Sequence, residues 1–567
     1  MFSSLHATAP RILAARSARR SLQRVQWFSD SVAHEESDIV IVGGGPAGLA
    51  LASALGASKA VQHGLRVTLV EAGDLSKVRE WSPPPGTFSN RVSSITNASQ
   101  AFLQDIGVWP HVEAERTCPV EEMQVWDGLS DARITFDAPE RSAFSGLARI
   151  TENLNLQRAL LRRLSTVPSV QLLDKVKVQA IQREERQGGD WPLVHLSDGR
   201  ILRARLLVGA DGFNSPVRAY AGIQSYGWAY DTHAIVATLF HAPRTAFEPT
   251  NTVAYQRFLP TGPIAFLPLS PTASSLVWST KPHLARALKA ADPIVLASLI
   301  NAAFRLPEVS LRYLHAQILE SQENGTLLSP QQVQEEIVWR ERSHNIDPRS
   351  AYSSSAPSVT AATGVPPADA DVLPPLVTSI QPGTIASFPL KFSHADTYIG
   401  EGAGARTVLV GDAAHTVHPL AGQGLNLGLA DVETLSRHIQ EAVSLGGDIG
   451  SYTVLQPYVR ERYFENHKML AAMDKLHKLY AQTAAPIVWA RSVGVEVLNE
   501  LDTIKAAMMV SAGSAGPSAR TSGWSLAVGG VERFARTVDS TRRVADGVAG
   551  LVGAGVQGLL KQMTPRG

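Results

Sequence analysis

The sequence predicts an α/β fold in which a Rossmann-like domain carries an inserted β-sheet and is followed by a helical C-terminal region. Three observations support this class. After residue 37, an apolar strand, a glycine-rich turn, a helix and a second strand follow one another. Short apolar runs recur from residue 234 to 280, which is typical of a sheet. From residue 431 to 501 the pattern is mostly helical.

The first turn has the spacing G-x-G-x-x-G, and the strand at residues 66–71 ends in Glu71. The residues of the turn are Gly43, Gly45, Pro46, Ala47 and Gly48. Glycines in this pattern allow a tight turn and close approach to a pyrophosphate, and the acid accepts hydrogen bonds from ribose hydroxyls. An ordinary glycine-rich turn is the alternative, but it does not require the second strand or its terminal acid. The turn therefore predicts a dinucleotide site.

A second glycine-rich loop follows a short apolar strand, residues 407–410, and leads into a helix. Its glycines let the backbone approach a ligand, and the helix N-terminus presents unpaired N–H groups and the positive end of a dipole. We expect this loop to bind an electron-rich ring that carries negative charge when reduced. The expected N–H donors are Gly422, Gly424, Leu425 and Asn426. Asp412, after Gly411, is expected to accept hydrogen bonds from sugar-like hydroxyls.

A third strand, residues 206–210, ends in Asp211 and Gly212. With the three motifs in this order, the sequence resembles the group A flavoprotein aromatic hydroxylases, which have the p-hydroxybenzoate hydroxylase fold. The resemblance implies a Rossmann-like FAD-binding domain in which the first turn holds the FAD pyrophosphate and Asp211 lies near it. It also implies that Gly411 and Asp412 bind the ribityl chain.

Four further segments narrow the resemblance to the ubiquinone-biosynthesis branch of this family. They are residues 91–95, 254–260, 262–269 and 415–426. Together with the arginine-rich N-terminus, they are similar to the eukaryotic mitochondrial monooxygenases that hydroxylate ring position 5. The resemblance covers roughly residues 37–300 and 380–500. It implies additional cofactor-binding candidates near the diphosphate or the ribityl chain, namely Arg91 and, more weakly, Asn153 and Gln157.

The resemblance implies FAD-dependent hydroxylation of the aromatic ring of a polyprenylated 4-hydroxybenzoate or phenol by O2, through a flavin hydroperoxide. Such a species must be shielded from water, because otherwise it decays to peroxide without product. We therefore expect a mostly apolar pocket. Its candidate walls are Tyr255, Phe266, Phe388 and Pro419, although an aromatic side chain on a strand is more often core than pocket.

His418 is a candidate proton shuttle. With His415 and Asp412 it also has a spacing that a metal ion can use. No further cluster of cysteine or histidine follows, so no metal is expected.

Only at residues 43–48 does a G-x-G-x-x-G lie in a strand–helix–strand pattern, so a second nucleotide domain for NAD(P)H is not expected. The resemblance implies ferredoxin and ferredoxin reductase as electron donors, and a membrane-associated complex with other ubiquinone-biosynthesis proteins. Two alternatives remain open. One is a flavin-stabilised structural subunit of that complex with little turnover, and the other is a flavin oxidase or epoxidase of the same fold that acts on another lipid. Flavin reoxidation with a hydroxylated product separates these functions.

Charge and composition restrict the class of protein. The net charge of +1 gives no reason to expect a nucleic-acid partner. The single cysteine, Cys118, excludes an internal disulfide and is expected to be a packing residue. Residues 1–36 are rich in arginine and serine and poor in acids, which is typical of a mitochondrial transit peptide, with a disordered basic tail as the alternative. The family resemblance, with its insoluble polyprenylated substrate, implies a peripheral protein on the matrix side of the mitochondrial inner membrane.

The expected domain organisation follows from these segments. It comprises a transit peptide at 1–36, an FAD-binding domain at 37–220 with a short β insertion, a substrate domain at 221–400 with a disordered insert at about 340–380, a second FAD-binding part at 401–440, a helical region at 441–510, and a linker with a helical tail at 511–567. The tail has an amphipathic pattern that suits either a membrane surface or a protein partner.

Overall fold

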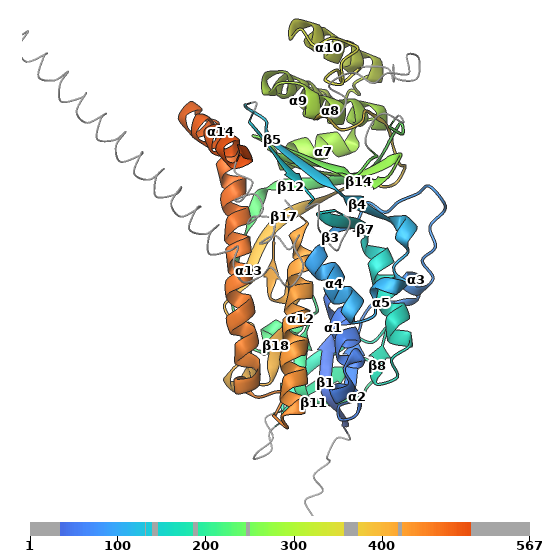
Figure 1. The fold of residues 1–567 in the computed structure, drawn as a ribbon, viewed down its shortest axis with the longest axis vertical. Helices are drawn as coiled ribbons and strands as arrows, with labels where there is room; N and C mark the ends of the chain where they lie inside the picture. The colour runs from blue at the N-terminus through green and yellow to red at the C-terminus, as the bar shows by residue number, and fades with distance from the viewer. Residues whose placement is uncertain are drawn as a thin grey trace, which may run out of the picture.

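The computed structural model describes residues 34–130, 132–138, 146–184, 191–244, 250–355, 372–417 and 422–500. Two large sheets lie one above the other along the long axis, and long C-terminal helices run along one side (Figure 1). Most of the expected transit peptide, part of the expected insert and the whole tail at 511–567 lie outside the described residues.

The first sheet confirms the Rossmann-like class. Its centre is parallel, and its order along the sheet is β8 (Val170–Leu173), β2 (Val67–Val70), β1 (Glu35–Val42), β11 (Ile201–Gly209) and β18 (Thr407–Leu409). The first half of β11 pairs with the antiparallel β10 (Pro192–Leu196), which pairs with β9 (Val178–Arg183). The side chains of β1 and β2 are buried throughout their inner parts, as expected for a parallel sheet that is covered on both faces.

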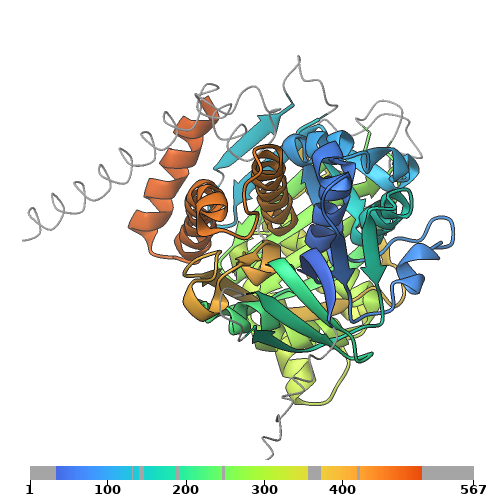
Figure 2. The same cartoon turned by 90° about the horizontal axis from the view of Figure 1, so that it is seen from below.

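Helices cover this sheet and bring its motifs together. α1 (Pro46–Ala57) packs against both α5 (Asn153–Ser165) and α12 (Gln423–Ser444), and it lies between them in the view from below (Figure 2). The shorter helices of this part are α2 (Lys59–Gln62), α3 (Ser76–Arg79), α4 (Asn97–Asp105) and α6 (Pro216–Tyr220). A small sheet of β3 (Val92–Thr96), β7 (Ala148–Glu152) and β4 (Thr117–Val120) lies between the two large sheets (Figure 1).

The second sheet is nine-stranded and contains the strands predicted between residues 234 and 280. Its order is β19 (His415–Thr416), β17 (Ala386–Ala395), β12 (Ser225–His241), β15 (Ala273–Thr280), β14 (Gly262–Ser270), β13 (Val253–Leu259), β5 (Glu122–Asp127) and β6 (Arg133–Asp137), with β16 (Val377–Ile380) also paired to β12. Strands β5 and β6 come from the segment expected to belong to the first domain. They join this sheet because β5 pairs in parallel with β13.

Four helices that the sequence analysis did not predict cover one face of the second sheet (Figure 1). They are α7 (Pro282–Ala290), α8 (Pro293–Arg305), α9 (Glu308–Glu323) and α10 (Pro330–Ser343). Their apolar sides and one face of the sheet form a closed core around Trp278 and Ile300. The other face of the sheet is turned toward the first sheet.

The structure corrects the expectation of a disordered insert at about 340–380 for the residues that it describes. The buried Glu341 carboxylate accepts hydrogen bonds from the Ser353 hydroxyl (2.9 Å) and the Ser355 N–H (3.2 Å). After the undescribed residues 356–371, Val377 exchanges two hydrogen bonds with the Asn301 side chain. Serine and proline suggested disorder, but buried partners on α8 and α10 satisfy the polar groups of these segments.

The helical prediction for residues 441–510 is confirmed as far as residue 500 by α13 (Tyr452–Tyr480) and α14 (Ala485–Glu500). α13 runs beside α12 (Figure 1). α14 packs on β6 and is held by a buried ion pair in which Arg491 Nε lies 2.6 Å from Asp127 Oδ2. Among the helices of the described part, none is long and apolar enough to cross a membrane.

Candidate cofactor site

The glycine-rich turn lies at the carboxyl end of β1. Gly43 has φ +109°, and a Cβ there would lie 2.3 Å from the Ala210 carbonyl oxygen. A Cβ at Gly48 would lie 1.9 Å from the Gly43 carbonyl oxygen. Gly45 borders open space and caps α1, and within the described part of the chain no side chain caps the first turn of that helix. A helix N-terminus without a side-chain cap, facing open space, suits a diphosphate.

Glu71 follows β2 and lies against this turn. Its two carboxylate oxygens accept hydrogen bonds from the N–H groups of Gly44 and Gly73, each at 2.5 Å. Each carboxylate oxygen can accept further hydrogen bonds, so the bonds to the backbone leave capacity for hydroxyl donors. The structure thus places Glu71 where a ribose-binding acid of this motif belongs, and its role stays a prediction.

Asp211 follows β11, the strand next to β1. Its Oδ2 accepts a hydrogen bond from the Val217 N–H at 3.1 Å. Its Oδ1 is buried and has no hydrogen-bond partner in the described part of the chain. Burial raises the pKa of Asp211, and hydrogen bonds from Ser215 and Val217 oppose this effect. A buried oxygen without a donor in the protein can accept a hydrogen bond from water or from a bound ligand.

The loop at Gly411 and Asp412 meets the glycine-rich turn. Gly411 has φ +59°, and a Cβ there would lie 3.2 Å from Ala47 Cβ at the start of α1. Asp412 is exposed, yet the protein atoms around it raise its pKa, while His415 acts in the opposite direction. An accessible carboxylate that is surrounded by protein atoms suits hydroxyl groups of a bound ligand.

The start of α12 lies beside this loop. Gly422 caps the helix with φ +60°, and no side chain of the described residues caps it, so its first N–H groups and positive dipole end are available. Gly424 and Leu425 belong to this first turn, as predicted. Asn426 has a second role: its Nδ2 donates to the Ser94 carbonyl (2.7 Å), and its Oδ1 accepts from the Thr96 N–H (3.1 Å). This side chain joins α12 to β3.

Arg91, Asn153 and Gln157 lie around the outer end of β3. Asn153 N donates to the Arg91 carbonyl at 3.0 Å, and its Oδ1 accepts from the Ser93 hydroxyl at 2.7 Å. Arg91 is exposed, and no described residue makes a hydrogen bond or an ion pair with its guanidinium. Gln157 lies one turn further along α5 and is partly exposed. The structure thus brings these three candidates together.

Replacing Asp412 by asparagine is expected to raise the Kd for FAD about tenfold. The substitution keeps the shape but removes the charge, and a hydrogen bond to a charged group contributes about 1.5–3 kcal/mol. Titration of the flavin-free protein with FAD measures this change. Asp198→Asn, in the exposed turn before β11, is the control and should leave the Kd unchanged. Equal Kd values for the two variants would contradict a role for Asp412.

The structure corrects the expectation that Tyr255 and Phe266 line a pocket. Both side chains are almost fully buried in the core between the second sheet and helices α7–α9. Their rings meet edge to face at 6.3 Å, and the Tyr255 hydroxyl accepts a hydrogen bond from Arg244 at 2.6 Å. They point away from the first sheet.

Phe388 lies on the other face of this sheet. Phe388 pairs with Ala234, so the two side chains lie on the same face of the sheet. The next residue, Ile235, belongs to the core on the helix side, which places Phe388 on the opposite face. The Phe388 side chain is 42% exposed. Leu267, Ala265 and Val277 lie on the same free face and are only partly buried. Phe388 therefore stays a candidate wall. Sequence reasoning missed Ala265 and Val277. They can be assigned to the free face only when the face covered by helices is known.

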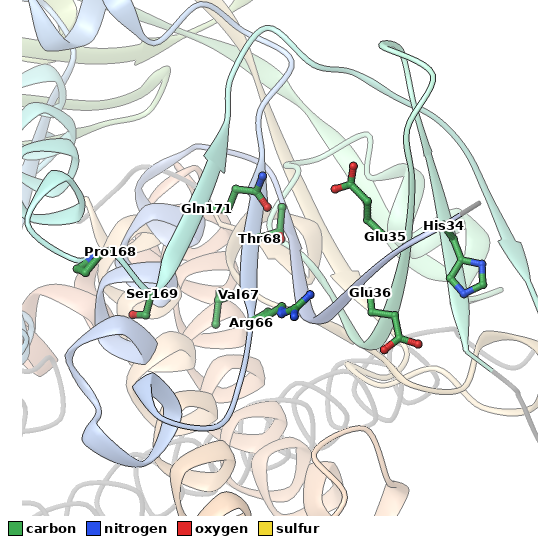
Figure 3. A pocket seen from close by; sticks show the side chains of 9 residues that line it. All are labelled: His34, Glu35, Glu36, Arg66, Val67, Thr68, Pro168, Ser169 and Gln171. Carbon is green, nitrogen blue, oxygen red and sulfur yellow. The ribbon is translucent and has the colours of Figure 1, made fainter. Parts of the chain in front are cut away.

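Two predicted residues, His418 and Pro419, lie outside the described residues. His415 is described, and its Nε2 lies 2.6 Å from Asp431 Oδ2. In the described ranges no group of three metal-ligand side chains is found. Figure 3 shows a pocket where β1, β2 and β8 begin, lined by residues that include Glu36, Arg66 and Gln171. Because open parallel sheets bind ligands beyond the carboxyl ends of their strands, this pocket is not the candidate site.

Comparison with known proteins agrees with this geometry. A family described as "FAD binding domain" matches residues 36–327 and 377–471. The ubiquinone biosynthesis monooxygenase COQ6, mitochondrial, of Xenopus tropicalis is 40% identical over 485 residues, which are 84% of this chain and 93% of that protein. The protein of the same name from Schizosaccharomyces pombe is 36% identical, over 85% of this chain and 92% of its own length.

Solved structures share the fold at low sequence identity. The p-nitrophenol 4-monooxygenase PnpA from Pseudomonas putida is 16% identical with a TM-score of 0.55, and the match covers 84% of this chain and 99% of that one. The OxyS anhydrotetracycline hydroxylase from Streptomyces rimosus is also 16% identical, with a TM-score of 0.52 over 85% of this chain and 76% of that one.

Proposed function

Because the chain belongs to the FAD-binding monooxygenase family that includes the mitochondrial ubiquinone biosynthesis monooxygenases, we propose that it hydroxylates the aromatic ring of a polyprenylated 4-hydroxybenzoate or phenol in ubiquinone biosynthesis. It is an FAD-dependent monooxygenase. The observation that carries the proposal is the meeting of the glycine-rich turn, Asp211 and the Gly411–Asp412 loop at one end of the parallel sheet.

The residues present fit FAD. The diphosphate would lie against the glycine-rich turn and α1, the ribose hydroxyls against Glu71, and the ribityl hydroxyls against Asp412. The first turn of α12 would stabilise the negative charge of the reduced ring through its N–H groups and its dipole. When bound, FAD supplies the activation of O2. A hydroxyl group of the cofactor, and not its diphosphate, would supply the donor that Asp211 Oδ1 lacks.

The free face of the second sheet is the proposed wall of the substrate site. It carries Leu267, Val277 and Phe388, none of which is fully buried, on the side opposite helices α7–α9. Apolar side chains there would orient the ring and exclude water. Exclusion of water would keep the activated oxygen from decaying to peroxide before it reaches the ring. A polyprenyl chain, which is itself apolar, suits the same surface.

The electron donors, complex partners and membrane location are part of this proposal. The names of the relatives support a mitochondrial location. Only one strand–helix–strand unit carries a G-x-G-x-x-G, which supports electron delivery without a separate nucleotide domain. The family resemblance implies ferredoxin and ferredoxin reductase as the donors. The insolubility of a polyprenylated substrate supports peripheral contact with the matrix side of the inner membrane, in a complex with other ubiquinone-biosynthesis proteins.

Aerobic turnover tests the proposal directly. The purified chain is given a ferredoxin system, a short-chain prenylated 4-hydroxybenzoate and labelled O2, and the product is analysed by mass spectrometry. We expect a flavin spectrum and a product heavier by one labelled oxygen. Peroxide without product would favour an oxidase, and bound flavin without reoxidation would favour the structural subunit. A chain without flavin would contradict the cofactor.

A further inference from the structure

Asp431, two turns into α12, carries a carboxylate that no FAD motif of the sequence analysis includes. Its side chain is fully buried. Oδ2 accepts hydrogen bonds from His415 Nε2 at 2.6 Å and from the Gly411 N–H at 3.1 Å. Oδ1 accepts from Arg462 Nε at 2.9 Å and from Asn466 Nδ2 at 2.8 Å. One carboxylate therefore receives donors from the Gly411–Asp412 loop, from β19 and from α13.

The electrostatics of this cluster keep the carboxylate ionised. Burial alone would raise the pKa of Asp431, but His415, Arg462 and Asn466 outweigh it and lower the pKa to about 2. A buried charge is tolerated only with such partners, and removing one partner leaves the others uncompensated. The carboxylate is thus ionised at working pH, with hydrogen-bond donors on both of its oxygens.

The two donors on α13 are themselves fixed. Arg462 and Asn466 are one turn apart on this helix and contact each other. Asn466 also donates to the Tyr398 hydroxyl at 3.2 Å, and that hydroxyl bonds to His394 Nε2 at 2.9 Å. The position of Asp431 is therefore tied through α13 to β17, which is part of the second sheet.

The Gly411 contact connects this cluster to the cofactor site. Gly411 directly precedes Asp412 and has a left-handed backbone. Because Asp431 holds the Gly411 N–H, it also restrains the backbone from which the Asp412 side chain extends. The same helix that carries Asp431 begins at Gln423, beside the loop. We propose that Asp431 is a positioning residue of the cofactor site, which holds the Gly411–Asp412 loop in register with the first turn of α12 and so sets the affinity for FAD.

A purely structural role is the competing explanation, and the chain contains a matched comparison for it. Asp127 forms an equally buried pair with Arg491, at 2.6 and 2.8 Å, and this pair anchors α14 to β5 rather than any cofactor motif. If burial and charge alone mattered, Asp127→Asn and Asp431→Asn would have the same consequences.

FAD binding to the full chain separates the two explanations. The flavin-free wild type, Asp431→Asn and Asp127→Asn are titrated with FAD, and the Tm of each is measured without FAD. We expect both substitutions to lower Tm, but only Asp431→Asn to raise the Kd, by at least tenfold, and to speed the dissociation of FAD. If Asp431→Asn does not fold, Asn466→Ala, which removes one donor, should raise the Kd at least threefold.

Two results would overturn the proposal. One is an unchanged Kd for Asp431→Asn and Asn466→Ala. The other is an equal rise of the Kd for Asp127→Asn at the same loss of Tm. The proposal rests on FAD binding at the Gly411–Asp412 loop and not on the hydroxylated substrate, so it can fail while turnover on a prenylated phenol succeeds, and the reverse also holds.

Discussion

Gly48→Ala is expected to lower the flavin content of the purified protein at least tenfold and to abolish hydroxylation. The added Cβ would lie 1.9 Å from the Gly43 carbonyl oxygen, a backbone atom that cannot move without displacing the glycine-rich turn. α1 would then be pushed away from the end of β1, and its N–H groups would no longer face the diphosphate. Absorbance of flavin per protein measures the loss, and circular dichroism verifies that the chain is folded.

The matched control for this prediction is Gly199→Ala. Gly199 also needs a glycine-like backbone, with φ +89°, but it lies in the exposed turn before β11 and borders open space. Its substitution should cost about 1–2 kcal/mol of stability through backbone strain and leave the flavin content unchanged. Full flavin content in Gly48→Ala would show that the turn does not hold the cofactor.

Phe266→Ala is expected to lower the free energy of unfolding by about 3–5 kcal/mol. Phe266 is fully buried between the second sheet and helices α7–α9, and removal of its ring leaves a cavity among Tyr255, Phe304 and their neighbours. Urea unfolding measures the change. Because the ring points away from the free face of the sheet, the ratio of peroxide to hydroxylated product should stay near that of the wild type.

Leu267→Ala, at the next position of the same strand, is expected to change the ratio of peroxide to product rather than the stability. Leu267 is partly exposed on the free face, so its truncation should cost less stability than that of Phe266. It should admit water to the substrate wall and raise the ratio of peroxide to product. If Phe266→Ala changed this ratio more than Leu267→Ala, the assignment of the two faces would be wrong.

The cofactor motifs could be predicted because their information is local. Gly48 is required by a backbone contact inside the turn, with the Gly43 carbonyl oxygen. Gly43 is required by a backbone contact with Ala210, which follows the neighbouring strand β11 in the sheet. Asp211 and Asp412 each follow a strand of one parallel sheet within three residues, and the carboxyl ends of such strands meet at one edge. The chain order of the motifs was therefore sufficient to place them together.

The pocket walls could not be predicted in the same way. Residues 262–269 are apolar at nearly every position, so the alternation that separates the two faces of a strand is absent. Which face is closed depends on helices α7–α9, and these were not predicted. Tyr255 and Phe266 were chosen as aromatic residues on the expected strands of the sheet, and aromatic side chains contribute much of the buried area of a closed core.

The sequence by itself determined the family, the cofactor and the positions of the glycines and acids that follow each strand, because these depend on backbone conformation and on order along the chain. Only the tertiary structure decided which face of the second sheet is free, which buried partners the described residues of the serine-rich segment have, and where the Asp431 carboxylate finds its own partners. Those partners are Gly411, His415, Arg462 and Asn466. They come from separate elements, and only the packing of α12 against α13 brings a buried charge and its donors within hydrogen-bond distance.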